Sequence, residues 1–164
     1  MLAYPRRVLL TNHVLAGALV GAASRGPVSA FLAGVASHFA MDVVHHWGDP
    51  DYGRFLWVAV VDGLIGAATM TQVTRRTPTD RRTRVFAGML GAAFPDADKP
   101  SELFFGWSPF PQAVDTFHKR IQRESTTRMP QEFLIAAVTG LAVRRWVLRS
   151  HVLTQVSTPP IPRH

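Results

Sequence analysis

Long apolar stretches, separated by short polar segments that contain glycine and proline, run through most of the chain. The stretches have the length and spacing of helices and give no convincing strand. The fold class predicted from this pattern is all-α, with one compact bundle of five to six helices over residues 1–156 and a disordered, proline-rich tail over 157–164. The expected helices cover residues 8–24, 27–46, 54–73, 84–93, 114–123 and 131–148.

Two segments are expected to interrupt the helices. A polar, basic loop is expected over residues 74–83. Pro95 and Pro100 are expected to force the segment 94–100 out of helical geometry, because proline has no N–H to donate and restricts the preceding residue. Gly17 and Gly21 have the spacing that permits another helix to approach the first one closely.

One apolar stretch, over residues 54–73, is long enough to cross a bilayer. Our first interpretation is therefore a membrane-associated bundle, in the inner membrane of the cell, with a soluble cytoplasmic protein as the alternative. If the first three helices all crossed, the basic segments 6–7 and 75–84 would lie on opposite sides, which the positive-inside rule disfavours. A cleaved signal peptide is a minority interpretation, because residues 11–13 interrupt the first apolar run.

Composition narrows the chemistry that the chain can perform. The 164 residues carry a net charge of +7 and include no cysteine. Disulfides, thiolate zinc sites and cysteine nucleophiles are therefore excluded, and a metal would need nitrogen and oxygen ligands, as zinc, manganese, iron and magnesium accept. The positive charge favours anionic partners, either phospholipid head groups or nucleic acid. Because no motif for nucleic-acid binding accompanies it, we prefer the interpretation that the basic clusters are interfacial anchors or solubilising ends of helices.

The strongest motif is His38-x-x-x-Asp42, which His45 and His46 follow closely. An α-helix turns once per 3.6 residues, so His38, Asp42 and His45 fall on one face of an otherwise apolar helix. Burying such groups without partners costs on the order of 1–3 kcal/mol for each, and a metal ion is one partner for all of them. A solvated helix end explains His45 and His46 equally well, but it does not explain His38.

Four further polar residues stand in or beside apolar segments: His13, Asp62, Asp96 and Asp98. In an extended segment, Asp96 and Asp98 can both face one ion. Each residue also has a purely structural explanation. His13 could be a histidine of the core or of a helix cap. Asp62 could mark a helix kink or form a salt bridge, and the Pro-Asp pair could form a solvent-exposed turn.

A basic segment near residue 120 adds a fifth group of candidates. His118 is a candidate metal ligand or general acid/base, and the three cations Lys119, Arg120 and Arg123 are candidates to bind phosphate or another anion. An amphipathic surface helix explains the three cations equally well.

Together these residues resemble the bacterial family of predicted membrane-bound metal-dependent hydrolases, over roughly residues 8–125. More distantly, the arrangement is similar to the helical superfamily of zinc-dependent phospholipase C and single-strand nucleases, which hydrolyse phosphate esters with several metals. The chain departs from the family pattern in the order of its motifs, and has only Phe117-His118-Lys-Arg where a His-Arg-Gly-x-x-His-Ser stretch is common. The resemblance is carried by Asn12-His13, His38-x-x-x-Asp42, Gly91-Ala-Ala-Phe-Pro-Asp96-x-Asp98 and His118.

The resemblance implies a divalent metal, with zinc as the first choice, and hydrolysis of a phosphoester or another ester by metal-activated water. Asp62, Asp98 and His118 would be catalytic, and Lys119, Arg120 and Arg123 would hold an anionic small-molecule or lipid substrate. The main alternative is a non-catalytic membrane-associated bundle whose polar groups join helices to one another. Nucleic-acid binding ranks last. The implied metal ligands are His13, His38, Asp42, Asp96 and His118.

Overall fold

The structure is a computed structural model that describes residues 9–44, 46–48 and 52–149. The all-α fold class predicted from the sequence is confirmed. The expected tail over 157–164 and His45 lie outside the described residues. The helices are α1 (Leu10–Ala23), α2 (Pro27–Asp42), α3 (Tyr52–Arg76), α4 (Thr79–Ala93), the 3₁₀ helix η1 (Phe94–Ala97), α5 (Asp98–Phe105), α6 (Gln112–Ile121), α7 (Met129–Ala142) and the π-helical turn η2 (Val143–Val147).

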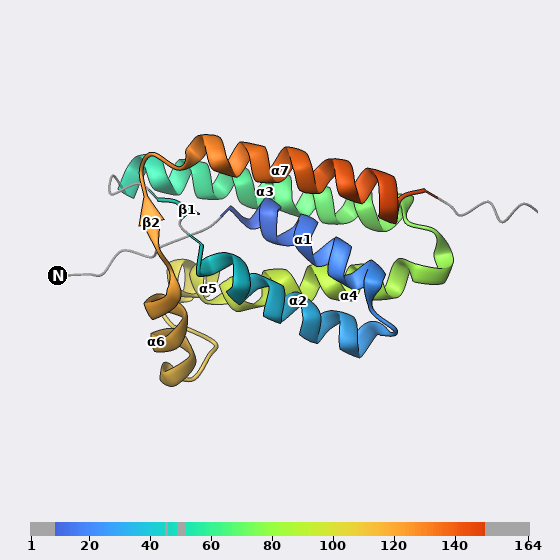
Figure 1. Ribbon diagram of the computed structural model, residues 1–164. Helices are drawn as coiled ribbons and strands as arrows, with labels where there is room; N and C mark the ends of the chain where they lie inside the picture. The colour runs from blue at the N-terminus through green and yellow to red at the C-terminus, as the bar shows by residue number, and fades with distance from the viewer. Residues whose placement is uncertain (1–8, 45, 49–51, 150–164) are drawn as a thin grey trace, which may run out of the picture.

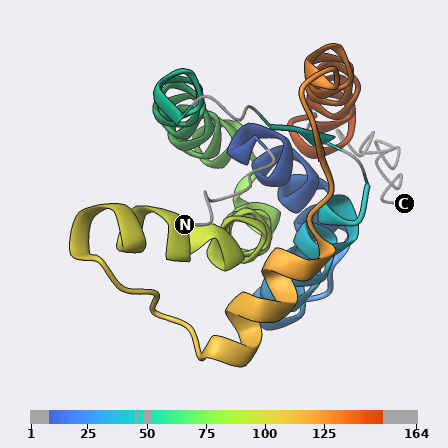
Figure 2. The same cartoon turned by 90° about the vertical axis from the view of Figure 1, so that its left-hand side faces the viewer.

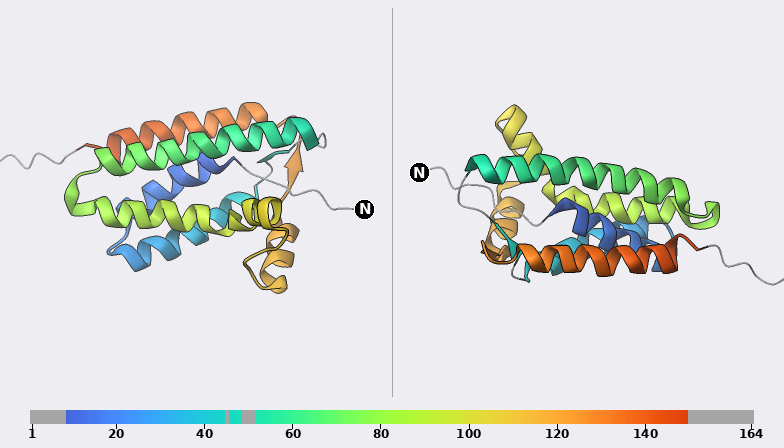
Figure 3. Two further views of the ribbon diagram at one scale, coloured as in Figure 1. Left: turned by 180° about the vertical axis from the view of Figure 1, so that it is seen from behind. Right: turned by 90° about the horizontal axis from the view of Figure 1, so that it is seen from above.

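Helix α1 lies at the centre of the bundle and packs against α2, α3, α4 and α7. Helices α3 and α7 lie on one side of it, and α2 and α4 lie on the other side (Figure 1). Figure 2, a view along the bundle, shows the same arrangement, with α5 and α6 at the end nearest the viewer. The view from above in Figure 3 shows α3 and α7 running along the bundle on either side of α1. The buried apolar core surrounds α1 and contains Val14, Ala18, Val85, Met89 and Val143.

Glycines allow α4 to approach α1 and α2 with backbone against backbone. A Cβ built on Gly17 would lie 2.5 Å from the carbonyl oxygen of Gly88, and a Cβ on Gly91 would meet the carbonyl oxygen of Phe31. A larger side chain at these positions therefore has no space. The close approach that the spacing of Gly17 and Gly21 permits is realised in the contact between α1 and α4.

The prediction of a loop over residues 74–83 is wrong. Helix α3 continues to Arg76 and α4 begins at Thr79, so only Thr77 and Pro78 separate them. The hydroxyl of Thr77 donates to the carbonyl oxygen of Val73 at 2.6 Å, so this polar side chain has a hydrogen-bond partner at the helix end. Pro78 cannot donate to the preceding turn, and the helix stops there.

The prolines at positions 95 and 100 also do not break helical geometry, contrary to the expectation. Pro95 lies at the start of η1, and Pro100 lies in the first turn of α5. The N–H groups of a first turn have no partner within the helix, so proline loses nothing there. As a consequence, Asp96 and Asp98 lie on helical backbone, where residues two apart point in different directions.

One short pair of strands was not expected. Strand β1 (His46–Trp47) pairs in parallel with β2 (Glu124–Ser125), and the N–H of His46 donates to the carbonyl oxygen of Arg123 at 3.0 Å. Helix α2 therefore ends at Asp42 rather than at 46, because the following backbone bonds to the segment after α6. This pairing holds the end of α2 next to the end of α6.

Apolar side chains cover much of the outside of the bundle. Trp57 and Leu64 on α3 are 69% and 68% exposed. Phe133 and Leu134 on α7 and Trp146 on η2 are exposed as well. Within the described residues, the segment Leu56–Arg76 of α3 is the one helix that is long and apolar enough to cross a membrane. Only 17% of its most apolar window is buried against the rest of the protein.

Candidate metal centre

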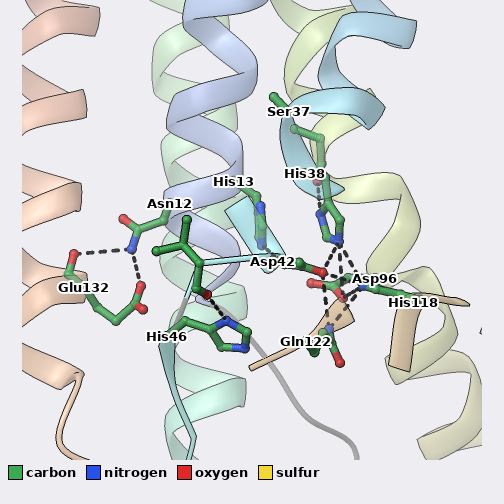
Figure 4. A network of polar contacts seen from close by, with 12 residues as sticks. Asn12, His13, Ser37, His38, Asp42, His46, Asp96, His118, Gln122 and Glu132 are labelled. Atoms are coloured by element: carbon green, nitrogen blue, oxygen red, sulfur yellow. Dashed lines mark hydrogen bonds and ion pairs between the residues drawn. The ribbon is translucent and has the colours of Figure 1, made fainter. Parts of the chain in front are cut away.

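Four segments bring His13, His38, Asp42, Asp96 and His118 to one end of the bundle, where their side chains point toward one another (Figure 4). His13 comes from α1, Asp96 from η1 and His118 from α6. His38 and Asp42 lie one turn apart on α2, as the helical spacing predicts. These are all five residues that the resemblance implied as metal ligands.

The centre is closed to solvent on most sides. His13, His38 and Asp42 are fully buried, and His118 is 2% exposed. The side chain of Asp96 is 13% exposed, so it is the member of the centre that solvent reaches most easily. Any molecule that reacts here would therefore approach past Asp96.

The carboxylate of Asp42 lies among the three imidazoles. Its Oδ2 is 2.8 Å from Nε2 of His118 and 3.3 Å from Nε2 of His38, and its Oδ1 is 3.4 Å from Nε2 of His13. Oδ1 of Asp96 lies 3.9 Å from Nε2 of His38 and 3.8 Å from Nε2 of His118. Two ligand atoms at about 2.1 Å from a tetrahedral zinc are about 3.4 Å apart, so the spacings of Asp42 from His13 and His38 are of the size that one shared ion requires.

Nε2 of His118 has more neighbours than one proton can satisfy. It lies 3.1 Å from Nε2 of His38, 2.8 Å from Oδ2 of Asp42 and 3.1 Å from Nε2 of Gln122. The first two neighbours accept a hydrogen bond, whereas the amide nitrogen of Gln122 donates one. A cation between His38, Asp42 and His118 would interact with the lone pairs of the His38 nitrogen and the Asp42 oxygen at the same time.

A backbone contact orients the ring of His38. Its Nδ1 donates to the carbonyl oxygen of Ala92 at 2.8 Å, so in the neutral ring Nε2 has no proton and its lone pair faces the centre. Metal-binding histidines commonly donate their second N–H in this way, which fixes the tautomer and the ring orientation. The ring of His13 stacks on that of His38, with 4.0 Å between the centroids.

The pKa values of two groups at the centre, His13 and Asp42, are shifted toward the forms that bind metal. Burial lowers the pKa of the His13 imidazole, and the neighbouring His38 lowers it further. Burial acts to raise the pKa of the Asp42 carboxyl, but its contacts with His118, His13 and His38 outweigh that effect and hold the pKa well below its usual range. A neutral imidazole and an ionised carboxylate are the forms that coordinate a metal ion. For His38, burial acts to lower the pKa, but its contacts with Asp42 and Asp96 outweigh that effect and raise it.

Several buried atoms at the centre have no hydrogen-bond partner in the structure. They include both ring nitrogens of His13, Oδ1 of Asp42 and Oδ1 of Asp96. Leaving a buried polar atom unpaired costs about 1–3 kcal/mol, so several together need a compensating partner. The group of His13, His38 and Asp42 can hold a metal ion, and so can the group of His38, Asp96 and His118.

Asp62 and Asp98, both expected to be catalytic, lie outside these two groups. Oδ1 of Asp62 accepts a hydrogen bond of 2.6 Å from the hydroxyl of Thr11, at the start of α1. Oδ2 of Asp98 forms a buried ion pair of 2.6 Å with Lys99. The extended segment expected around Asp96 and Asp98 is helical instead, and only Asp96 belongs to a group that could hold an ion.

The three cations expected to bind substrate are exposed on the far side of α6 or just after it. Lys119 lies 3.6 Å from Glu102, and Arg120 lines a shallow depression with Gln112 and Phe117. His118 faces inward, and its next two neighbours in a helix necessarily face other directions. A substrate-binding role for Lys119, Arg120 and Arg123 stays a prediction.

Sequence reasoning missed several polar residues that the structure places in the interior, among them Gln122 and Glu132. Gln122 follows His118 by four residues and reaches the centre with it. Glu132 is 1% exposed, accepts 2.6 Å and 3.2 Å hydrogen bonds from the Asn12 amide and the Trp47 N–H, and joins α7 to α1. Glu132 could have been found, because it is a single acid in an apolar helix, as Asp62 is.

His46 is buried in β1 but belongs to neither ligand group. Its Nδ1 donates to the carbonyl oxygen of Val44 at 3.0 Å. In Figure 4 its ring lies apart from the imidazoles of the centre. Of the two histidines His38 and His46, His38 therefore belongs to the centre, while the ring of His46 forms a hydrogen bond within the turn that leads into β1.

Comparison of the chain with protein-family models, with curated proteins and with solved structures finds no match in any of the three. The resemblance to the hydrolase family stays a prediction.

Proposed function

We propose that the protein is a metal-dependent hydrolase that acts on a phosphoester or another ester. The observation that carries the proposal is the convergence of three imidazoles and two carboxylates, from four segments, in a buried site where several of their atoms have no partner. Such a donor set of nitrogen and oxygen atoms suits zinc first, and also manganese or iron. The ligands would be His13, His38, Asp42, Asp96 and His118.

A divalent ion held by these side chains would supply Lewis-acid stabilisation of negative charge and lower the pKa of a bound water toward about 7. The chain itself supplies the rest. Asp62 lines the same cavity as Asp96 and is suited to accept a proton there. Asp98 is less suited, because Lys99 already neutralises its carboxylate. Lys99 also lines the cavity, but its ammonium group is paired with Asp98 at 2.6 Å and is not free to neutralise an anionic substrate.

Replacing Asp62 with asparagine tests this assignment. We expect the rate of metal-dependent ester hydrolysis to fall by about 10²–10⁴, the usual contribution of a general base, while the bound metal is retained. Asp80→Asn is the matched control, because Asp80 lies in the first turn of α4 at the opposite end of the bundle. The assay uses aryl phosphomonoesters, phosphodiesters and carboxylic esters with the zinc- or manganese-loaded protein. Equal rates for both variants would contradict the role of Asp62, and a loaded wild-type protein that cleaves none of these esters would contradict hydrolysis.

We further propose that the bundle resides in a membrane, with α3 crossing it. Two observations support this location: the length of the apolar segment of α3, and the exposed apolar side chains on α3 and α7. A soluble protein rarely exposes so many large apolar residues. After expression in bacteria, we expect the protein to stay in the membrane fraction through a wash at alkaline pH. Recovery in the soluble fraction without detergent would contradict this location.

A second candidate function is a non-catalytic bundle whose buried polar groups join the helices. The hydrogen bonds from Asn12 to Glu132 and from Thr11 to Asp62 favour it, since they link α1 to α7 and to α3 without any ion. These contacts do not involve the three imidazoles. The hydrolysis assay separates the two candidates, because a structural bundle gives no metal-dependent rate.

A further inference from the structure

A cavity of about 400 Å³ adjoins the metal centre, between α3 and the segment formed by η1 and α5. Asp62, Asp96 and Lys99 supply its polar lining. Since Asp96 belongs to both the cavity and the centre, a molecule in the cavity can reach the centre directly. The polar lining therefore marks where a reacting head group would lie.

The remaining walls are almost entirely apolar. They include Leu10, Leu56, Ala59, Leu64 and Phe104. Leu64 and Phe104 are also 68% and 74% exposed, so the cavity opens onto the apolar outside of the bundle. A small, fully polar substrate would leave these apolar walls exposed to water, whereas a hydrocarbon chain would cover them.

We propose that the cavity binds the hydrocarbon chain of a lipid ester whose head group lies at the polar end of the cavity, beside Asp96 and the metal centre. This inference rests on the proposed hydrolase and names its substrate class. The side opening lies beside α3, the helix suited to cross the membrane, so a lipid can enter from the bilayer without leaving it. The head group then meets the centre while the chain stays in an apolar environment.

Gly63 offers a way to fill the cavity without disturbing the fold. It lines the cavity on α3, and a Cβ built there meets no atom within 4 Å. Gly63→Leu therefore occupies space that the lipid chain would use, and it replaces a glycine within a helix by a better helix former. Gly140→Leu is the matched control, because Gly140 on α7 is equally open and lies outside this cavity.

The test measures the binding of alkyl phosphates with four to twelve carbons to the two variants in the same detergent. Comparing variants at each chain length cancels the partition of the probe into micelles. We expect Gly63→Leu to weaken binding of dodecyl phosphate at least about tenfold relative to Gly140→Leu, and binding of butyl phosphate by less than about twofold, since each buried methylene contributes about fourfold in affinity. Thermal unfolding of both variants verifies that each is folded.

A ratio of affinities that does not change with chain length would overturn the inference, even where short-chain esters are hydrolysed. A ratio that grows with chain length would support it, even where no ester is cleaved and the proposed hydrolysis fails. The binding and hydrolysis measurements therefore test separate claims.

Discussion

Replacing Asp42 with asparagine is expected to abolish metal binding while leaving the bundle folded. The Asp42 carboxylate contacts His13, His38 and His118 at 3.4, 3.3 and 2.8 Å, so it faces all three imidazoles. Asparagine keeps nearly the same shape but removes the negative charge and one acceptor oxygen. Zinc or manganese at about 100 times its dissociation constant should stabilise the wild-type protein by about 2.7 kcal/mol, and Asp42→Asn by close to nothing. Thermal unfolding with and without added metal measures both effects.

His46→Gln is the matched control for this experiment. His46 is 2% exposed and close in sequence to the centre, yet it belongs to neither ligand group. The His46→Gln variant should keep the full stabilisation by metal. Should Asp42→Asn gain as much stability from metal as the wild-type protein, the ion would have to bind elsewhere.

Gly88→Leu is expected to destabilise the whole bundle. A Cβ at Gly88 meets the carbonyl oxygen of Gly17 and lies 2.7 Å from the Cα of Gly21, so it collides with backbone rather than with a movable side chain. Helices α1 and α4 must separate to relieve this collision. Overpacking of a core costs about 1–3 kcal/mol, and a collision with rigid backbone places this substitution at about 3 kcal/mol or more. Chemical denaturation followed by circular dichroism measures the loss.

Gly140→Leu is again the control, because its added side chain meets no atom within 4 Å. It should change the free energy of unfolding by less than about 1 kcal/mol. Separation of α1 from α4 would also move His13 away from Asp96, since α4 leads directly into η1. A Gly88→Leu protein with wild-type stability would show that the two backbones are not in contact.

Helical periodicity predicted much of the site. His38 and Asp42 lie one turn apart on an apolar helix, and the structure buries both, as the one-face argument requires. His13 and Asp96 were recognisable because an ionisable residue in or beside an apolar helix must have a partner. Which of these groups meet one another depends on the packing of four segments, and periodicity within one helix cannot determine that.

Local rules failed where a residue type has two structural uses. Pro95 and Pro100 were interpreted as helix breakers, although proline is also favoured in the first turn of a helix, and both lie in such turns. That error made Asp96 and Asp98 appear equivalent, whereas helical backbone directs one into the centre and leaves the other paired with Lys99. Glu132 was missed although it gives the same sequence signal as Asp62, a single acid in an apolar helix.

Metal analysis of the purified full-length protein, combined with X-ray absorption spectroscopy, tests the central claim most directly. We expect roughly one or more equivalents of a transition metal. The absorption spectrum should show nitrogen and oxygen ligands at about 2.0–2.2 Å, and the signal should disappear in His38→Ala. A protein that contains no metal and takes up neither zinc nor manganese would contradict the claim that these imidazoles and carboxylates converge to hold an ion.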